Sequence, residues 1–99
     1  MTYPNDIRQE NTFGIRYEGL RIIPSRAAMR ELYKCGKALV DVVEILEFGQ
    51  DAPRKRKHGT IERWLGKKNK VYNAVIVRDY NERLKEECWV LIHFGKFSK

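Results

Sequence analysis

Two histidines and a local run of cations are the residues whose types and spacing could do chemistry in this chain. The run Arg54-Lys55-Arg56-Lys57 is followed at once by His58, and His93 lies in an apolar stretch further on. Histidine ordinarily takes up and releases protons near neutral pH, so both are candidate general acids or bases. The alternatives stay open, because His58 fits a plain surface loop and His93 fits a hydrogen-bonded position in a sheet.

Cleavage of RNA without a metal ion is the chemistry that such residues could support. It needs a base for the 2′-hydroxyl proton, an acid for the leaving oxygen and cations for the phosphate. Arginine can pair with phosphate through two hydrogen bonds, and tyrosine can donate a proton or stack on a base. Glu62 fits either a general base or the ion-pair partner of a nearby cation. The candidate catalytic residues are His58, His93, Arg63 and Tyr72.

The net charge of +7 is concentrated in one segment, which is typical of a protein with a polyanionic partner. Residues 51–72 contain eight Lys or Arg and two acids, whereas 1–50 is balanced at seven against seven. A local patch of one sign attracts phosphate backbones, although a solvated loop is the alternative. The candidate nucleic-acid-binding residues are Arg54, Lys55, Arg56, Lys57, Lys67, Lys68, Lys70 and Arg78.

Other classes of chemistry have no motif in the chain. It contains neither GxxxxGK[ST] nor GxGxxG, which argues against nucleotide hydrolysis and dinucleotide binding. The basic half has no clustered carboxylates for Mg²⁺. Cys35 and Cys88 are predicted to be small buried hydrophobes, neither disulfide-bonded nor ligands of a metal. We therefore expect no cofactor and no metal.

Two helices and three or four strands must position these residues. Alternating apolar residues predict a short strand within 13–23, and Ser25 can cap a helix that ends near Cys35 before Gly36. Helical spacing with interleaved acids predicts a second helix at about 39–48. Alternation predicts strands at 60–65, 70–78 and 87–94, the first two joined by a turn at Gly66 to Asn69.

This order of elements predicts an α+β fold in a single domain, residues 13–99, preceded by a flexible arm of residues 1–12. The economical packing places both helices on one face of a small curved antiparallel sheet of three to four strands. The other face would stay partly open as the cleft. Trp64 and Trp89 fit either the core or a surface on which bases stack.

Five segments resemble a family of small prokaryotic domains grouped with the RelE/ParE-like toxins, which also include barnase-like ribonucleases. They are Arg26-Ala27-Ala28-Met29-Arg30, Gly36, Val42-Val43-Glu44-Ile45-Leu46, Arg63-Trp64-Leu65-Gly66 and Lys70 to Val77. Family members commonly begin the first helix with His-Ala, where this chain has Arg26-Ala27. The resemblance implies a RelE-like fold and RNA (including mRNA on the ribosome) as substrate or partner. An acidic antitoxin-like protein is the alternative partner.

We therefore expect a metal-independent, toxin-type endoribonuclease. The alternatives are a non-catalytic nucleic-acid-binding module and a basic domain that pairs with an acidic protein. No apolar run approaches the roughly 20 residues of a membrane-spanning helix, and the N-terminus lacks the basic start and apolar core of a secretion signal. The expected location is thus the cytoplasm, with no membrane partner. The sequence does not indicate an oligomeric state.

Overall fold

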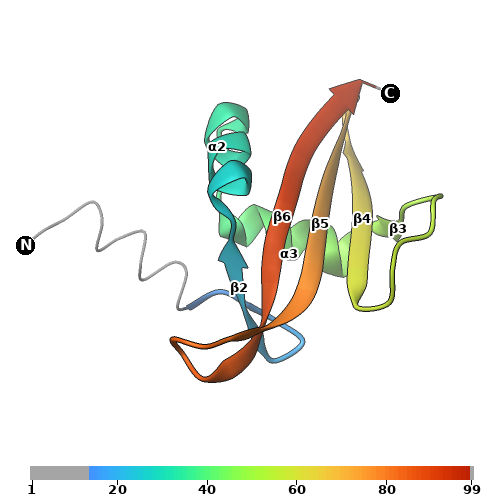
Figure 1. The fold of residues 1–99 in the computed structure, drawn as a ribbon. Coiled ribbons are helices and arrows are strands. Elements are labelled where there is room, and N and C mark those ends of the chain that lie inside the picture. The colour runs from blue at the N-terminus through green and yellow to red at the C-terminus, as the bar shows by residue number, and fades with distance from the viewer. Residues whose placement is uncertain (1–13, 99) are drawn as a thin grey trace, which may run out of the picture.

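The computed structural model describes residues 14–98, so the predicted arm at residues 1–12 lies outside the described residues. Two helices are followed by three long strands (Figure 1), with short strands before and between them. The elements in chain order are β1 (Arg16–Tyr17), β2 (Leu20–Pro24), α2 (Arg26–Cys35), α3 (Leu39–Phe48), β3 (Gln50–Asp51), β4 (Thr60–Lys67), β5 (Lys70–Asn81) and β6 (Glu86–Ser98).

The predicted sheet of three to four antiparallel strands, and with it the RelE-like arrangement, was wrong. The described residues form one six-stranded mixed sheet in the order β1-β2-β6-β5-β4-β3, in which β2 runs parallel to β6. The long strands also extend further than predicted, since β5 continues to Asn81 and β6 to Ser98. Mostly β structure with two covering helices is therefore the correct description.

The predicted strand at residues 13–23 is in fact a hairpin. Glu18 and Gly19 both have positive φ, at 49° and 81°, which is the backbone of a tight two-residue hairpin turn. The turn reverses the chain between β1 and β2, and β2 then pairs with β6. The sequence did not predict this turn, because a residue such as Glu18 rarely adopts a positive φ.

Both helices begin and end where the sequence predicted. Ser25 Oγ accepts a hydrogen bond from the Ala28 backbone N–H at 3.1 Å, and Gly36 ends α2 with a left-handed φ of 66°. At the start of α3 the Asp41 carboxylate accepts a hydrogen bond from the Ala38 backbone N–H. Neither helix, nor any other helix in the described part of the chain, is long and apolar enough to cross a membrane.

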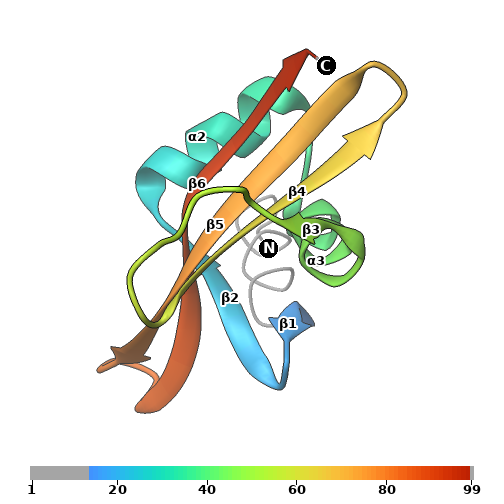
Figure 2. The same cartoon turned by 90° about the vertical axis from the view of Figure 1, so that its right-hand side faces the viewer.

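The sheet has two different faces, which we call the helix face and the loop face. Both helices pack on the helix face. The connection from β3 to β4 (residues 52–59) extends beyond the β4 edge of the sheet (Figures 1 and 2), and Arg54 and Arg56 in it bind Glu62 on the other face. Side chains alternate along each strand, except at a bulge in β6 where Ile92 has no partner on β5, so the register shows which face each residue occupies. The core residues Ala74, Ile76, Leu91 and Phe94 lie on the helix face, and Glu62, Trp64, Asn73, Val75, His93 and Gly95 lie on the loop face.

Both cysteines are free, and the prediction that they are buried is right for Cys88 but not for Cys35, which is only partly buried. Cys88 is buried, and burial raises the pKa of its thiol, which favours the unreactive protonated form.

Candidate nucleic-acid interface

Glu62 is the centre of the loop face and holds the connection of residues 52–59 against the sheet. Its side chain, only 1% exposed, accepts hydrogen bonds from Arg54 Nε and Nη2 (both 3.0 Å), Arg56 Nε (2.9 Å) and Trp64 Nε1 (2.9 Å). Asn73 Nδ2 lies 3.3 Å away. The Arg54 hydrogen bonds, aided by the other donors, lower the pKa of Glu62 to about 2. Glu62 is therefore an ion-pair partner and not a general base.

The basic run divides into inward arginines and outward lysines. Arg54 and Arg56 bind Glu62, whereas Lys55 and Lys57, which alternate with them, are exposed. Within residues 14–98, neither lysine side chain forms a hydrogen bond or an ion pair, and the same holds for the side chain of the exposed His58. The two lysines are thus free to contact a polyanion, while the arginines hold the segment that carries them.

His93 lies on the loop face and is held by a carboxylate from α2. Its Nδ1 lies 3.2 Å from Glu31 Oε2, and Glu31 Oε1 accepts a hydrogen bond from the Phe94 backbone N–H at 2.8 Å. The nearby carboxylate favours the neutral tautomer that carries its proton on Nδ1, and in that tautomer Nε2 is an acceptor. The His93 side chain is 44% exposed, so it remains accessible to a substrate.

An aromatic pair lies on the same face as His93. The Trp64 and Phe97 rings meet edge to face, with centroids 5.1 Å apart, and Phe97 is 40% exposed. In the register, Trp64 pairs with Asn73, which pairs with Gly95 on β6. Trp89 differs, because it is buried in the core on the helix face. Of the two tryptophans, only Trp64 can belong to a stacking surface on the loop face.

Two predicted catalytic residues lie on the opposite face from His93. Arg63 donates hydrogen bonds to Asp51 Oδ1 at 2.6 Å and to the Leu46 carbonyl at 2.7 Å, so it ties β4 to β3 and to the end of α3. Tyr72 packs against the Phe94 ring, with Lys37 Nζ 4.9 Å from the Tyr72 ring centroid. The expectation that Arg63 and Tyr72 share one site with His93 is therefore corrected.

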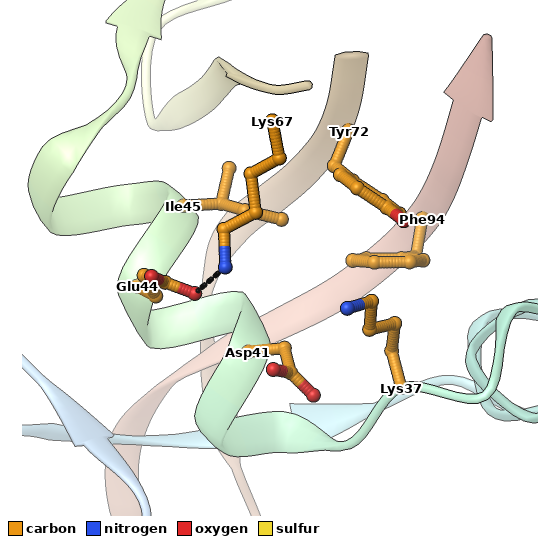
Figure 3. A pocket seen from close by; sticks show the side chains of 7 residues that line it. All are labelled: Lys37, Asp41, Glu44, Ile45, Lys67, Tyr72 and Phe94. Carbon is orange, nitrogen blue, oxygen red and sulfur yellow. Dashed lines mark hydrogen bonds and ion pairs between the residues drawn. The ribbon is translucent and has the colours of Figure 1, made fainter. Parts of the chain in front are cut away.

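Tyr72 lines a shallow pocket between α3 and the sheet on the helix face (Figure 3). The pocket encloses about 190 Å³ of space that includes open solvent. Lys67 reaches across it to the Glu44 carboxylate at 2.7 Å, and this hydrogen bond raises the pKa of Lys67. The lining residues are Lys37, Asp41, Glu44, Ile45, Lys67, Tyr72 and Phe94.

The remaining predicted binding residues do not gather beside the basic run. Lys67, Lys70 and Arg78 all lie on the helix face, where Lys70 donates to Ser98 Oγ and Arg78 pairs with Glu87 over the Trp89 ring. Lys68 occupies the turn between β4 and β5 with a φ of 57°. Strand alternation places Lys67, Lys70 and Arg78 on one face, whereas Glu62 ties the basic run to the other, so the predicted binding residues do not form a single surface.

Three residues of the loop-face site were not predicted from the sequence. Glu31 is one charged residue among several in a predicted helix, and Gly95 lies just beyond the strand predicted at 87–94. Asn73 carried a usable signal, because a polar amide in the middle of an otherwise apolar strand must find partners when it is buried. Groups of three or more His, Cys, Asp or Glu that could hold a metal ion are not found in residues 14–98.

Comparisons of the chain with protein-family models, with curated proteins and with solved structures give no match. The resemblance to small domains grouped with the RelE/ParE-like toxins therefore stays a prediction.

Proposed function

We propose that this protein binds single-stranded RNA on its loop face and cleaves it without a metal ion. The observation that supports this most is His93, a half-exposed imidazole whose Nδ1 lies 3.2 Å from Glu31 Oε2, an arrangement that favours the tautomer in which Nε2 can act as a base. It lies on the face that carries the basic run and an exposed aromatic ring. The proposed substrate is cellular RNA, so the proposed place of action is the cytoplasm.

Binding would combine charge and stacking. Lys55 and Lys57 supply cations for the phosphates. Phe97, whose ring packs against Trp64, supplies a surface on which an unpaired base can stack. Arg54 also stays available, because its side chain is 61% exposed and only Nε and Nη2 are used by Glu62. An unpaired base with its phosphate is the ligand that this combination fits.

Cleavage would proceed by transfer of the phosphoryl group within the RNA. The 2′-hydroxyl gives its proton to His93 Nε2, its oxygen forms a bond to the neighbouring phosphorus, and the bond from phosphorus to the 5′-oxygen breaks. The leaving 5′-oxygen takes a proton from solvent, and His93 later returns its own proton to solvent. The products are a 2′,3′-cyclic phosphate and a 5′-hydroxyl, with no other reactant consumed.

The test compares RNA cleavage by the wild type with that by His93→Ala and His58→Ala, all in EDTA. We expect the wild type to release cyclic-phosphate ends, His93→Ala to lose roughly 10²- to 10⁴-fold in rate, and His58→Ala to keep most activity. Circular dichroism would verify that both variants are folded. Intact RNA with the wild type, or undiminished cleavage by His93→Ala, would overturn the assignment.

A non-catalytic nucleic-acid-binding module is the second candidate. It is favoured because Arg54 and Arg56 form ion pairs with Glu62, and these pairs leave fewer cations to neutralise a reacting phosphate. The same samples decide between the two functions. Salt-dependent binding of RNA with no cleavage would support the module.

A further inference from the structure

The His93 imidazole leans along β6 towards Phe97. A β-carbon built on Gly95 would lie 3.2 Å from His93 Nε2, so this nitrogen lies within about 5 Å of the Gly95 Cα. Gly95 follows His93 by two positions and precedes Phe97 by two, and all three lie on the loop face. Because two positions of a strand cover about 6.6 Å, His93 Nε2 is nearer to Phe97 than the roughly 13 Å between their Cα atoms would suggest.

The Phe97 ring is held towards the middle of the same face. Its centroid lies 5.1 Å from that of Trp64, whose Nε1 donates a hydrogen bond to Glu62 Oε2 at 2.9 Å. Trp64 and Gly95 occupy one row of the sheet, since both pair with the same residue of β5. The contact with Trp64 therefore keeps the Phe97 ring beside the row over which the His93 imidazole leans.

A cation lies across the sheet from His93. Glu62 and His93 both pair with Val75, so they are two strands apart, or about 10 Å. Glu62 holds Arg54 through Nε and Nη2, and Nη1 of the same guanidinium forms no hydrogen bond within residues 14–98. Since the Arg54 side chain is 61% exposed, Nη1 can bind an anion over the centre of the loop face.

An aromatic ring, an imidazole and a cation that surround one small area fit the parts of one nucleotide. The base, the 2′-hydroxyl and the 3′-phosphate are all attached to a single ribose, so the groups that bind them must lie close together. Groups that bind different nucleotides would instead follow one another along the strand of RNA. The arrangement of Phe97, His93 and Arg54 around the row of Trp64 and Gly95 is of the first kind.

We propose that the site binds one nucleotide as a unit, the nucleotide whose 2′-hydroxyl attacks: its own base stacks on Phe97, the hydroxyl donates to His93 Nε2, and its 3′-phosphate binds Arg54. This proposal rests on the proposed cleavage of RNA and specifies the substrate. A base in a duplex is stacked between its neighbours, whereas an unpaired base can turn out and stack on an aromatic side chain. The substrate is therefore RNA in which the nucleotide on the 5′ side of the cleaved bond is unpaired.

The experiment uses single-stranded oligonucleotides with one ribonucleotide among deoxynucleotides, because cleavage can then start only from the 2′-hydroxyl of that ribonucleotide. One version carries adenine on the ribonucleotide, a second lacks a base there, and a third lacks the base two nucleotides away on either side. For the wild type in EDTA, we expect removal of the ribonucleotide's base to lower kcat/KM roughly 5- to 150-fold, the usual worth of one stacked base, and removal of a distant base to lower it less than about 3-fold.

Phe97→Ala should lower kcat/KM by a similar factor with the adenine version and by less than about 3-fold with the version that lacks this base, because ring and base then act as one contact. Tyr80→Ala, which truncates an exposed ring on the helix face, should change neither value. Should Phe97→Ala not fold, Phe97→Leu provides the second variant, since it keeps an apolar side chain beside Trp64 and removes the stacking surface.

Three results would overturn the proposal: full-rate cleavage at a ribonucleotide without its base, an equal effect of the folded variant at Phe97 on both versions, or a larger effect of the distant base. Cleavage of all-RNA strands but not of strands with a single ribonucleotide would overturn it too, because neighbouring 2′-hydroxyls would then be required. Failure of the wild type to cleave any of these strands, all-RNA included, would instead overturn the proposed function itself.

Discussion

Replacement of Glu62 by glutamine tests whether this carboxylate holds residues 52–59 against the sheet. The variant keeps an oxygen that can accept from Trp64 and Asn73, but it loses the charge that pairs with Arg54 and Arg56. We expect the free energy of unfolding near neutral pH to fall by about 2–4 kcal/mol, the usual cost of breaking a buried, hydrogen-bonded charge pair. The fold should survive, because the hydrophobic core lies on the other face.

The pH dependence of this loss follows from the pKa of Glu62, which folding lowers from 4.5 to about 2. Such a change corresponds to about 3 kcal/mol of stability. Because the pKa is lower in the folded protein, this stability is fully present above about pH 5 and is lost as the pH falls from 4.5 towards 2. Between pH 6 and pH 3, the difference in stability between wild type and Glu62→Gln should shrink by roughly 2 kcal/mol.

Urea unfolding at pH 6 and pH 3, followed by circular dichroism, measures this difference directly. Glu44→Gln is the control, because Glu44 forms a half-exposed pair with Lys67 that should contribute less than about 1 kcal/mol. Parallel loss of stability with falling pH in the wild type and in Glu62→Gln would refute the role given to Glu62.

Two further predictions concern the interface with RNA. Replacing Lys55 and Lys57 together by glutamine should reduce the slope of log affinity against log salt concentration by about 1.4, since each phosphate contact of a single strand contributes about 0.7. Lys96→Gln, on the helix face, should leave the slope unchanged in the same titrations, and an unchanged slope in the double variant would remove both lysines from the interface. Phe97→Ala should weaken binding of single-stranded RNA by roughly 5- to 150-fold through lost stacking, as measured by anisotropy. Tyr80→Ala, which truncates another exposed ring, is its control, and an equal effect of the two would contradict a specific platform at Phe97.

The helices could be predicted because their signals are local. Ser25 and Gly36 cap α2 with contacts to residues three or four positions away, and the acids of α3 mark its solvent side at helical spacing. The long strands were recognised in the same way, by alternation. The pairing of β6 with β2 was not recognised, because the parallel contact between residues 21–24 and 88–91 joins segments that are separated by most of the domain.

Part of the site could also be predicted from local information. His93 and the basic run were identified as candidates because their residue types alone distinguish them. Which face each cation occupies depends on strand register, and Arg63, which was grouped with His93 as a catalytic candidate, lies on the opposite face of the sheet. Glu31 meets His93 across 62 positions of the sequence, a contact that no local pattern contains.

The position of Glu31 also matters for how copies of this protein behave together. Pairing between β2 and β6 stops at Leu91, so the outer edge of β6 from Ile92 onwards could accept a strand from another molecule. Glu31 places a charged group on that edge and occupies the amide of Phe94. Removal of this carboxylate would expose a hydrogen-bonding edge and invite self-association. Variants at Glu31 should therefore be assayed only after their monomeric fraction has been isolated.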